Sequence, residues 1–202
     1  MADGIRFGPI GASARHLCVD MQRLFLPGSP WAVPDLKRIV PPIIRLAEHQ
    51  PQRTLFTRFI PPQEIDEAQG SWARLYEKWP GVLRANLDED ALELLPELAG
   101  HAPAGRVIDK MVYSPWLGAT LGGMLAADGV DTLVVTGAET EVCVLATVIG
   151  AVERGYRVIL VADAICSSAR ETHCATLEVC SQRFGQQIET AGLAEVMRIW
   201  AA

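Results

Sequence analysis

Three reactive side chains each follow an apolar run of the sequence. Asp20 ends the run LCVD, Lys110 ends VIDK, and Cys143 follows TLVVTG after a short polar stretch. If these runs are neighbouring strands of one parallel sheet, their carboxyl ends meet at one edge, where open α/β sheets bind ligands. A carboxylate can take a proton from a thiol, and an ammonium can stabilise the resulting charge. The three residues together therefore predict a nucleophilic cysteine.

The position of Cys143 supports this interpretation. It lies in the first turn of a predicted helix for which Thr140 is a suitable N-cap, so the helix dipole and free N–H groups favour a thiolate. Each residue also has an ordinary alternative role. A cysteine in an apolar helix is usually a buried hydrophobe, and charged residues at strand ends often form caps or solvated edges. Only the combination of the three favours catalysis.

A cysteine–histidine pair is the rival nucleophilic system. His16 begins the first predicted strand, so it lies at the opposite end of the sheet from Asp20. His173 is closer, in the helix after the fifth strand, but a histidine beside a capping box usually serves local structure. We interpret the remaining histidines as surface residues and the remaining cysteines as structural ones: His49, His101, Cys18, Cys166, Cys174 and Cys180.

The segments that must position these residues alternate between strand-like and helix-like patterns. Strands are predicted over residues 15–21, 53–59, 106–111, 132–137, 157–162 and, with a weaker pattern, 187–191. Helices are predicted over 35–49, 88–98, 117–127, 140–154 and 168–184, the last opening with a capping-box spacing of Ser168 and Glu171. Strands of near-continuous Val, Leu and Ile need cover on both faces. We therefore expect an α/β fold, a three-layer doubly wound sandwich around a mostly parallel six-stranded sheet.

Composition limits the class of protein. At 202 residues, of which 50% are hydrophobic, the chain predicts a single domain over 1–202, with 1–13 as a flexible N-terminal tail. A net charge of -6 without any basic run argues against nucleic-acid binding. No stretch approaches the roughly 18 apolar residues of a membrane span, and no apolar leader is visible, so we expect a cytoplasmic protein without a membrane partner. The five cysteines lack C-x-x-C spacing, which argues against a disulfide framework or a structural zinc site.

Five segments carry a resemblance to a known family. They are LCVDMQRLF, LFTRFIPP, VIDKMVYSPW, VVTGAETEVCVLATV and RVILVADAICS, spread over nearly the whole chain. The sequence resembles the isochorismatase-like cysteine hydrolases, which include nicotinamidases and carbamoyl amidases. The family's Asp, Lys and Cys triad falls on Asp20, Lys110 and Cys143. The resemblance also implies a cis peptide bond between Ala138 and Glu139, with the N–H groups of Glu139 and Cys143 forming an oxyanion hole.

The resemblance further implies a reaction. The Cys143 sulfur attacks a carbonyl carbon, Asp20 passes the proton to the departing amine, and water hydrolyses the thioester. Nicotinamidase-like members place histidine ligands for a metal after the second strand, whereas this stretch reads TRFIPPQEIDEAQGSW and has no histidine, so we expect neither metal nor cofactor. Isochorismatases that cleave a vinyl ether do not use the cysteine. Cys143 therefore favours a small amide, ureido or carbamoyl substrate.

The substrate pocket is predicted less directly. We expect Gln22, Phe25, Tyr113 and Trp116 to line it. Trp72, Tyr76 and Trp79, which share a helical stripe with Leu75, form either a wall or lid of the pocket or simply a core-facing surface. The resemblance and the apolar composition favour a homo-oligomer.

Two other functions stay open. One is a small-molecule-binding module of Rossmann type without chemistry of its own, although no G-x-G-x-x-G follows the first strand and the glycines of LGATLGG come after the third. The other is a catalytically silent member of the family that acts as a binding partner. Turnover of any amide would distinguish these from the hydrolase.

Overall fold

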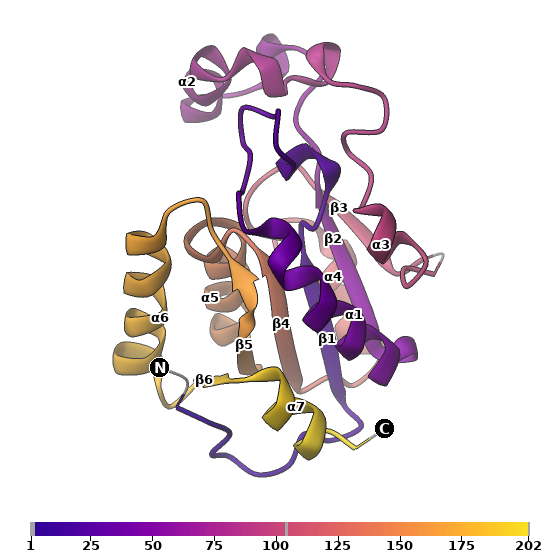
Figure 1. Cartoon of the computed structure of the whole chain (residues 1–202), viewed down its shortest axis with the longest axis vertical. Helices are drawn as coiled ribbons and strands as arrows, with labels where there is room; N and C mark the ends of the chain where they lie inside the picture. The colour runs from indigo at the N-terminus through magenta and orange to yellow at the C-terminus, as the bar shows by residue number, and fades with distance from the viewer. Residues whose placement is uncertain (1–2, 104, 202) are drawn as a thin grey trace.

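The computed structural model describes residues 3–103 and 105–201 and is built on one six-stranded sheet (Figure 1). The strands lie in the order β3-β2-β1-β4-β5-β6, and every pair of neighbours is parallel. Their bounds are β1 Ala14–Val19, β2 Thr54–Phe59, β3 Val107–Lys110, β4 Thr132–Ala138, β5 Arg157–Cys166 and β6 Ile188–Ala191. The predicted α/β sandwich is confirmed. All six strands were predicted, and β5 runs four residues further than its pattern indicated because Ile165 and Cys166 pair with Gly137 and Ala138.

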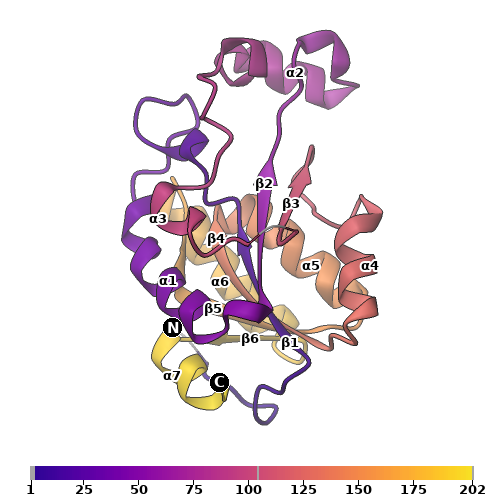
Figure 2. The same cartoon turned by 90° about the vertical axis from the view of Figure 1, so that its right-hand side faces the viewer.

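Helices cover both faces of the sheet (Figure 2). Three lie on one face: α1 Val40–His49, α3 Pro96–Ala99 and α7 Leu193–Ile199. Three lie on the other: α4 Ala119–Ala127, α5 Leu145–Glu153 and α6 Arg170–Phe184. Short 3-10 helices connect the elements: Arg23–Phe25, Leu36–Ile39, Pro51–Arg53, Ile65–Glu67, Pro80–Val82 and Arg84–Asn86.

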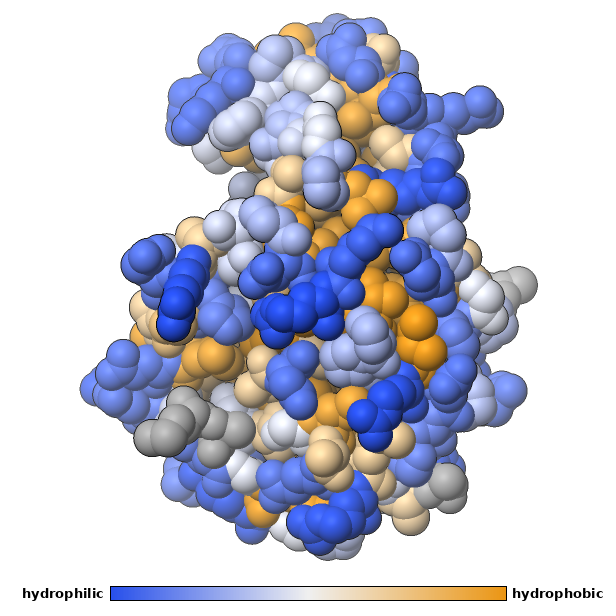
Figure 3. All heavy atoms as spheres, viewed as in Figure 1, coloured by the Kyte–Doolittle hydropathy of each residue, from blue (hydrophilic) through white to orange (hydrophobic). Residues whose placement is uncertain are grey.

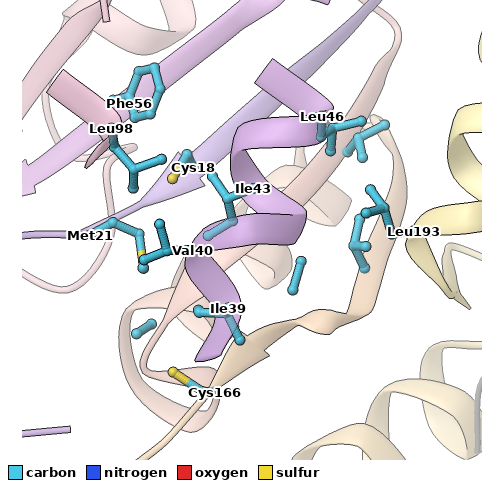
Figure 4. Close-up of a cluster of buried hydrophobic side chains, with 14 of the residues drawn as sticks. Cys18, Met21, Ile39, Val40, Ile43, Leu46, Phe56, Leu98, Cys166 and Leu193 are labelled. Carbon is cyan, nitrogen blue, oxygen red and sulfur yellow. The ribbon is translucent and has the colours of Figure 1, made fainter. Parts of the chain in front are cut away.

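The two faces of the sheet form two separate cores. Successive side chains of a strand point to opposite faces, so Cys18 of β1 joins the core under α1 whereas Leu17 and Val19 join the core under α5. Figure 4 shows the first of these cores, in which Ile43 of α1 reaches toward β1. Because the inner strands have no solvent side, their sequence is mainly apolar, and this pattern allowed them to be predicted.

A long excursion between β2 and β3 leaves the sandwich. It carries α2 Ser71–Lys78, which lies beyond the carboxyl ends of the strands (Figures 1 and 2). Its small core contains buried Tyr76, Val82 and Leu83, with Trp31 from the segment after β1 packed against it. Figure 3 shows apolar side chains in the waist between this excursion and the sheet-bearing body. The excursion thus stands over the edge of the sheet where ligands of such folds bind.

The helix predicted over 88–98 is mostly absent. Only Pro96–Ala99 is helical, and the residues before it run as turns beside the segment after β1. The N–H of Arg23 donates to the Glu93 carbonyl at 3.0 Å, and the N–H of Leu95 donates to the Met21 carbonyl at 2.9 Å. These backbone bonds to a distant segment replace those of a helix, so tertiary contacts override the local pattern.

The predicted capping box at the start of α6 is also wrong. The helix begins at Arg170, and its N-cap residue Ala169 has no side chain able to cap. The N–H of Ser168 instead donates to Oε1 of Glu139 at 2.8 Å. The serine therefore ties the beginning of α6 to the turn after β4.

The N-terminal segment is ordered against the last strand, in contrast to the flexible tail expected over 1–13. Glu189 of β6 is fully buried and accepts the N–H groups of Arg6 at 2.5 Å and Phe7 at 3.0 Å. Arg157 of β5 pairs with the same carboxylate at 2.7 Å. A buried carboxylate needs such partners, and they fix residues that the sequence alone suggested were free. The positions 1 and 2 of the expected tail lie outside the described residues.

Among the described residues, none of the helices is both long and apolar enough to cross a membrane.

Candidate active site

Three strand ends bring Asp20, Lys110 and Cys143 together. Asp20 directly follows β1, Lys110 is the last residue of β3, and Cys143 lies in the helical turn after β4. Lys110 Nζ is 2.6 Å from Asp20 Oδ2 and donates to Cys143 Sγ at 3.4 Å. Asp20 is completely buried, and the other two residues are each 6% exposed. A carboxylate, an ammonium and a thiol therefore share one almost completely buried site.

Asp20 is held in an unusual backbone conformation. Its φ is 50°, the left-handed region that residues other than glycine rarely adopt. Thr57 of β2 fixes the residue at two points, because its hydroxyl donates to Asp20 Oδ1 at 2.6 Å and accepts the N–H of Asp20 at 3.2 Å. The second carboxylate oxygen is left to face Lys110. Thr57 was missed by sequence reasoning, since a threonine within a buried strand carries no signal of its own.

Lys110 remains charged in spite of its burial. Burial lowers its pKa, but the neighbouring Asp20 and Cys143 raise it, and the net effect is a pKa above the ordinary value. The ammonium also donates to the carbonyl of Val112 at 3.2 Å and lies 5.0 Å from the ring centre of Phe59. It is therefore a positioned cation rather than a solvated charge at a strand end.

Cys143 is a neutral thiol at rest, in contrast to the thiolate that its position in the sequence suggested. Burial raises its pKa well above the ordinary value, Asp20 raises it further, and Lys110 opposes both without overcoming them. The turn that carries it, Thr140–Val144, is a π-helix rather than the opening turn of an α-helix. Burial, followed by the charges of Asp20 and Lys110, therefore sets the pKa of the sulfur.

Polar side chains connect the turn after β4 to the end of β5, to the segment that follows it and to α6. The peptide bond between Ala138 and Glu139 is cis. Glu141 accepts the hydroxyl of Ser167 at 2.6 Å, and the Thr140 hydroxyl donates to the carbonyl of Cys166 at 3.1 Å. His173 of α6 forms a 2.8 Å hydrogen bond with the Thr140 hydroxyl and not with the cysteine. His173 therefore stabilises the turn and does not contact the cysteine.

His16 lies away from the three residues, as its place at the start of β1 predicts. It is fully buried between the hydroxyls of Thr54 at 3.2 Å and Thr136 at 2.8 Å. Burial lowers its pKa to about 3, so the ring is neutral. Of the remaining cysteines, Cys174 is exposed, and the other three are buried: Cys18, Cys166 and Cys180.

A cavity of about 440 Å³ opens next to Cys143. Of the predicted lining residues, Phe25, Trp79 and Tyr113 contribute to its wall, as do Glu139 and Cys143. Seven further wall residues are not among the predicted lining residues, although Leu75 belongs to the helical stripe of Trp79: Pro30, Trp31, Ala32, Phe59, Leu75, Val142 and Ser168. Phe59 could have been inferred, because it ends a strand at the ligand-binding edge, whereas the segment around Trp31 carries no comparable signal.

Gln22 lies outside the cavity wall, in contrast to the prediction. Its amide accepts the N–H of Phe59 at 2.7 Å and donates to the carbonyls of Phe59 at 3.1 Å and Leu92 at 2.8 Å. All of these partners are backbone groups, and the side chain is fully buried. Gln22 therefore joins the ends of three segments beneath the site.

Trp72 and Trp116 also lie elsewhere. Trp72 packs with its ring centre 4.7 Å from that of Tyr113 and lines a smaller hollow behind it. Trp116 donates its indole N–H to the carbonyl of Thr147 at 2.8 Å, and Gly150 of α5 leaves room for its ring, since a Cβ there would lie 2.2 Å from it. Both are packing residues, although Trp72 supports a wall residue from behind.

Within the described part of the chain, no cluster of three or more His, Cys, Asp or Glu side chains has the arrangement of a metal site.

Comparison with known proteins agrees with this architecture. A family model, the Isochorismatase domain, matches residues 15–192. The chain belongs to the isochorismatase family. Among the relatives of this isochorismatase-family protein is the maleamate amidohydrolase of Pseudomonas putida, which is 26% identical over 96% of this chain and 91% of the relative.

Solved structures extend the comparison. A cysteine hydrolase from Pseudomonas syringae superimposes with a TM-score of 0.81 at 26% identity, covering 98% of this chain and 97% of the other. A pyrazinamidase/nicotinamidase from Streptococcus mutans superimposes with a TM-score of 0.70 at 25% identity, covering 87% and 99%. With its family and these neighbours, the chain is an isochorismatase-family hydrolase.

Proposed function

We propose that this isochorismatase-family hydrolase cleaves the C–N bond of a small amide, ureido or carbamoyl compound through a thioester on Cys143. The observation that carries the proposal is the contact among three groups beside a cavity: Asp20 with Lys110 at 2.6 Å, and Lys110 with the Cys143 sulfur at 3.4 Å. The relatives named above as amidases support the choice of a C–N bond.

The charges of the site support a defined first step. Because the resting sulfur is a thiol, its proton must leave as the sulfur attacks, and Asp20 is the base within reach. Lys110 stays protonated and stabilises the negative charge as it passes from the Asp20 carboxylate to the sulfur. As the C–S bond forms, the carbonyl oxygen becomes an oxyanion, for which the N–H groups of Glu139 and Cys143 are the proposed donors.

The remaining steps balance with the same residues. The tetrahedral intermediate collapses with cleavage of the C–N bond, and Asp20 returns its proton to the departing nitrogen, which leaves as ammonia or an amine. A water molecule then attacks the thioester carbonyl while Asp20 takes one of its protons. Cleavage of the C–S bond releases the acid, and the proton returns to the sulfur. Only water is consumed besides the substrate.

The test combines turnover with identification of the intermediate. A panel of primary amides, ureides and carbamoyl compounds is screened for release of ammonia, and acid-quenched enzyme is analysed by mass spectrometry for an added acyl group on Cys143. Cys143→Ala should abolish both signals. Cys174→Ala, at an exposed cysteine outside the site, is the matched control and should retain them.

Two results would contradict the proposal. Full turnover by Cys143→Ala would show that no thioester on this residue is required. Absence of turnover across the panel would favour a catalytically silent member of the family that binds small molecules.

A further inference from the structure

The wall of the cavity is made largely of apolar surface. Five aromatic side chains from different parts of the chain contribute to it: Phe25, Trp31, Phe59, Trp79 and Tyr113. They come from the segment after β1, the last residue of β2, the segment after β3 and the end of α2, and the ring centre of Phe59 lies 5.8 Å from that of Trp31 and 6.4 Å from that of Tyr113. A ligand that enters must exchange water for aromatic and aliphatic contacts.

The charges near the cavity are unfavourable for an anion. Among the described residues that line it, Glu139 is the single charged one, and none is Arg, Lys or His. Lys110 lies behind this wall and is already paired with Asp20 at 2.6 Å. A carboxylate on the ligand would therefore lose its hydration without meeting a free cation.

Arginines do occur near the site, but they line a different hollow. Arg38 and Arg170 border a second cavity that shares only Ser168 with the first. Arg38 is paired there with Asp35 at 3.6 Å. An acyl group seated beside Cys143 would have to pass Ser168 before it could use either guanidinium.

We infer that the substrate is an amide, ureide or carbamoyl compound whose acyl side is uncharged and apolar and fits within a cavity of about 440 Å³, and that carboxylate-bearing acyl groups are excluded. This inference rests on the proposed function and narrows it. The inference also excludes maleamate, the substrate named for the maleamate amidohydrolase relative, because maleamate carries a carboxylate. The selectivity arises from the aromatic walls and from the lack of Arg, Lys or His among the described lining residues, which leaves the cavity without a counter-charge for an anion.

A binding experiment without turnover tests the inferred selectivity. Cys143→Ala is titrated at neutral pH with three amides of the same shape and different charge: p-toluamide, terephthalamate and para-(aminomethyl)benzamide. Trp31 and Trp79 line the cavity, so their fluorescence reports occupancy. We expect p-toluamide to bind at least about tenfold more tightly than either charged analogue. Equal or tighter binding of a charged analogue overturns the inference, as does a failure of p-toluamide to bind.

A charge placed in the wall provides the complementary test. Leu75 lines the cavity from α2 and is partly exposed. Leu75→Arg in the Cys143→Ala background should improve terephthalamate binding at least about tenfold relative to Leu75→Gln, the uncharged control of similar size. If the arginine has no effect, charge in this wall does not decide selectivity. If terephthalamate binds tightly to the parent and Arg170→Gln abolishes that binding, the second hollow holds the carboxylate and the inference is wrong.

The inferred selectivity and the proposed reaction can each be rejected independently of the other. Preferential binding of p-toluamide by Cys143→Ala, without ammonia release from any neutral amide by the wild type, would retain the selectivity and reject the proposed reaction. Hydrolysis of terephthalamate in preference to p-toluamide would retain the reaction and reject the selectivity.

Discussion

The Cys143 thiol lies beside an ion pair whose two charges shift the pKa of the thiol in opposite directions. Asp20 raises the pKa of the sulfur, Lys110 lowers it, and burial leaves the thiol protonated. Such an arrangement holds a neutral nucleophile next to its base until a substrate arrives, and it avoids the cost of two buried anions side by side. The signs of these effects can be tested one residue at a time.

Lys110→Met and Asp20→Asn should change the reactivity of Cys143 in opposite directions. Loss of the ammonium raises the pKa of the thiol further and should slow its alkylation by iodoacetamide, whereas loss of the carboxylate should speed it. Both variants should lose amidase activity by at least about 100-fold, since one lacks the stabilising cation and the other lacks the base. The measurement is the rate of modification at Cys143 across a pH series, followed by mass spectrometry.

Superimposable alkylation curves for the wild type and Lys110→Met would reduce Lys110 to a structural residue. Circular dichroism and thermal melting identify a variant that has simply failed to fold.

Thr57 is expected to position the base. Thr57→Val removes the two hydrogen bonds that the Thr57 hydroxyl forms with Asp20, while keeping the shape of the side chain. The expected result is a fall in kcat of about 10-fold or more with little change in KM, because the carboxylate is misaimed while the cavity wall is untouched. Thr57→Ser keeps the hydroxyl and should recover most of the activity. A rise in KM without a change in kcat, or no recovery by serine, would contradict a positioning role.

At the scale of elements, the turn after β4 determines where the sulfur lies. Gly137, two residues before Glu139, has a φ of 112° and passes so close to β1 that a Cβ would lie 2.1 Å from the carbonyl oxygen of Val19. Glycine is therefore required at this point both for its conformation and for the space. The same close approach brings the turn bearing Cys143 beside the residue that follows β1.

Gly137→Ala should be severely destabilising, whereas Gly155→Ala provides a matched control. Gly155 also has a positive φ, 82°, but its Cβ would meet nothing within 4 Å. The control should lose about 1–2 kcal/mol of unfolding free energy through backbone strain alone. Gly137→Ala should lose about 3 kcal/mol or more beyond that, because β1 and β4 must separate. Urea unfolding compares the two, and equal losses would show that the sheet can accommodate the extra methyl group.

At the scale of the whole molecule, buried titratable groups link the strands and make the fold sensitive to acid. His16 bridges β2 and β4 as a neutral ring, and Glu189 joins β6 to Arg157 and to the N-terminal segment. Burial lowers the pKa of His16 to about 3. Burial tends to raise the pKa of Glu189, but its hydrogen bonds from Arg157 and the backbone outweigh this and lower it. Both groups contribute stability at neutral pH that is lost in acid.

For His16 the pH window follows from its two pKa values. The unfolded chain binds a proton below about pH 6.5, and the folded protein binds it only near pH 3, so the unfolded state carries more protons between these limits. The unfolding free energy should therefore fall by about 1.4 kcal/mol for each pH unit of acidification within the window from this residue alone. His16→Gln, which cannot titrate, should reduce the measured slope by about that amount.

Urea unfolding at several pH values measures the slope, with His101→Gln at a partly exposed loop position as the control. An unchanged slope in His16→Gln would mean that the buried ring is not the acid-sensitive group.

The sequence by itself determined the strands, their parallel pairing and the edge at which Asp20, Lys110 and Cys143 meet. This was possible because buried parallel strands are mainly apolar on both faces and because their carboxyl ends must share an edge. The tertiary structure decided what depends on distant contacts. It placed residues 88–95 in turns beside the segment after β1, fixed the N-terminal residues on Glu189, and made Gln22 and Trp116 packing residues. It also made Cys143 a neutral thiol, since the pKa of a buried group depends on burial and neighbouring charges that spacing along the chain does not reveal.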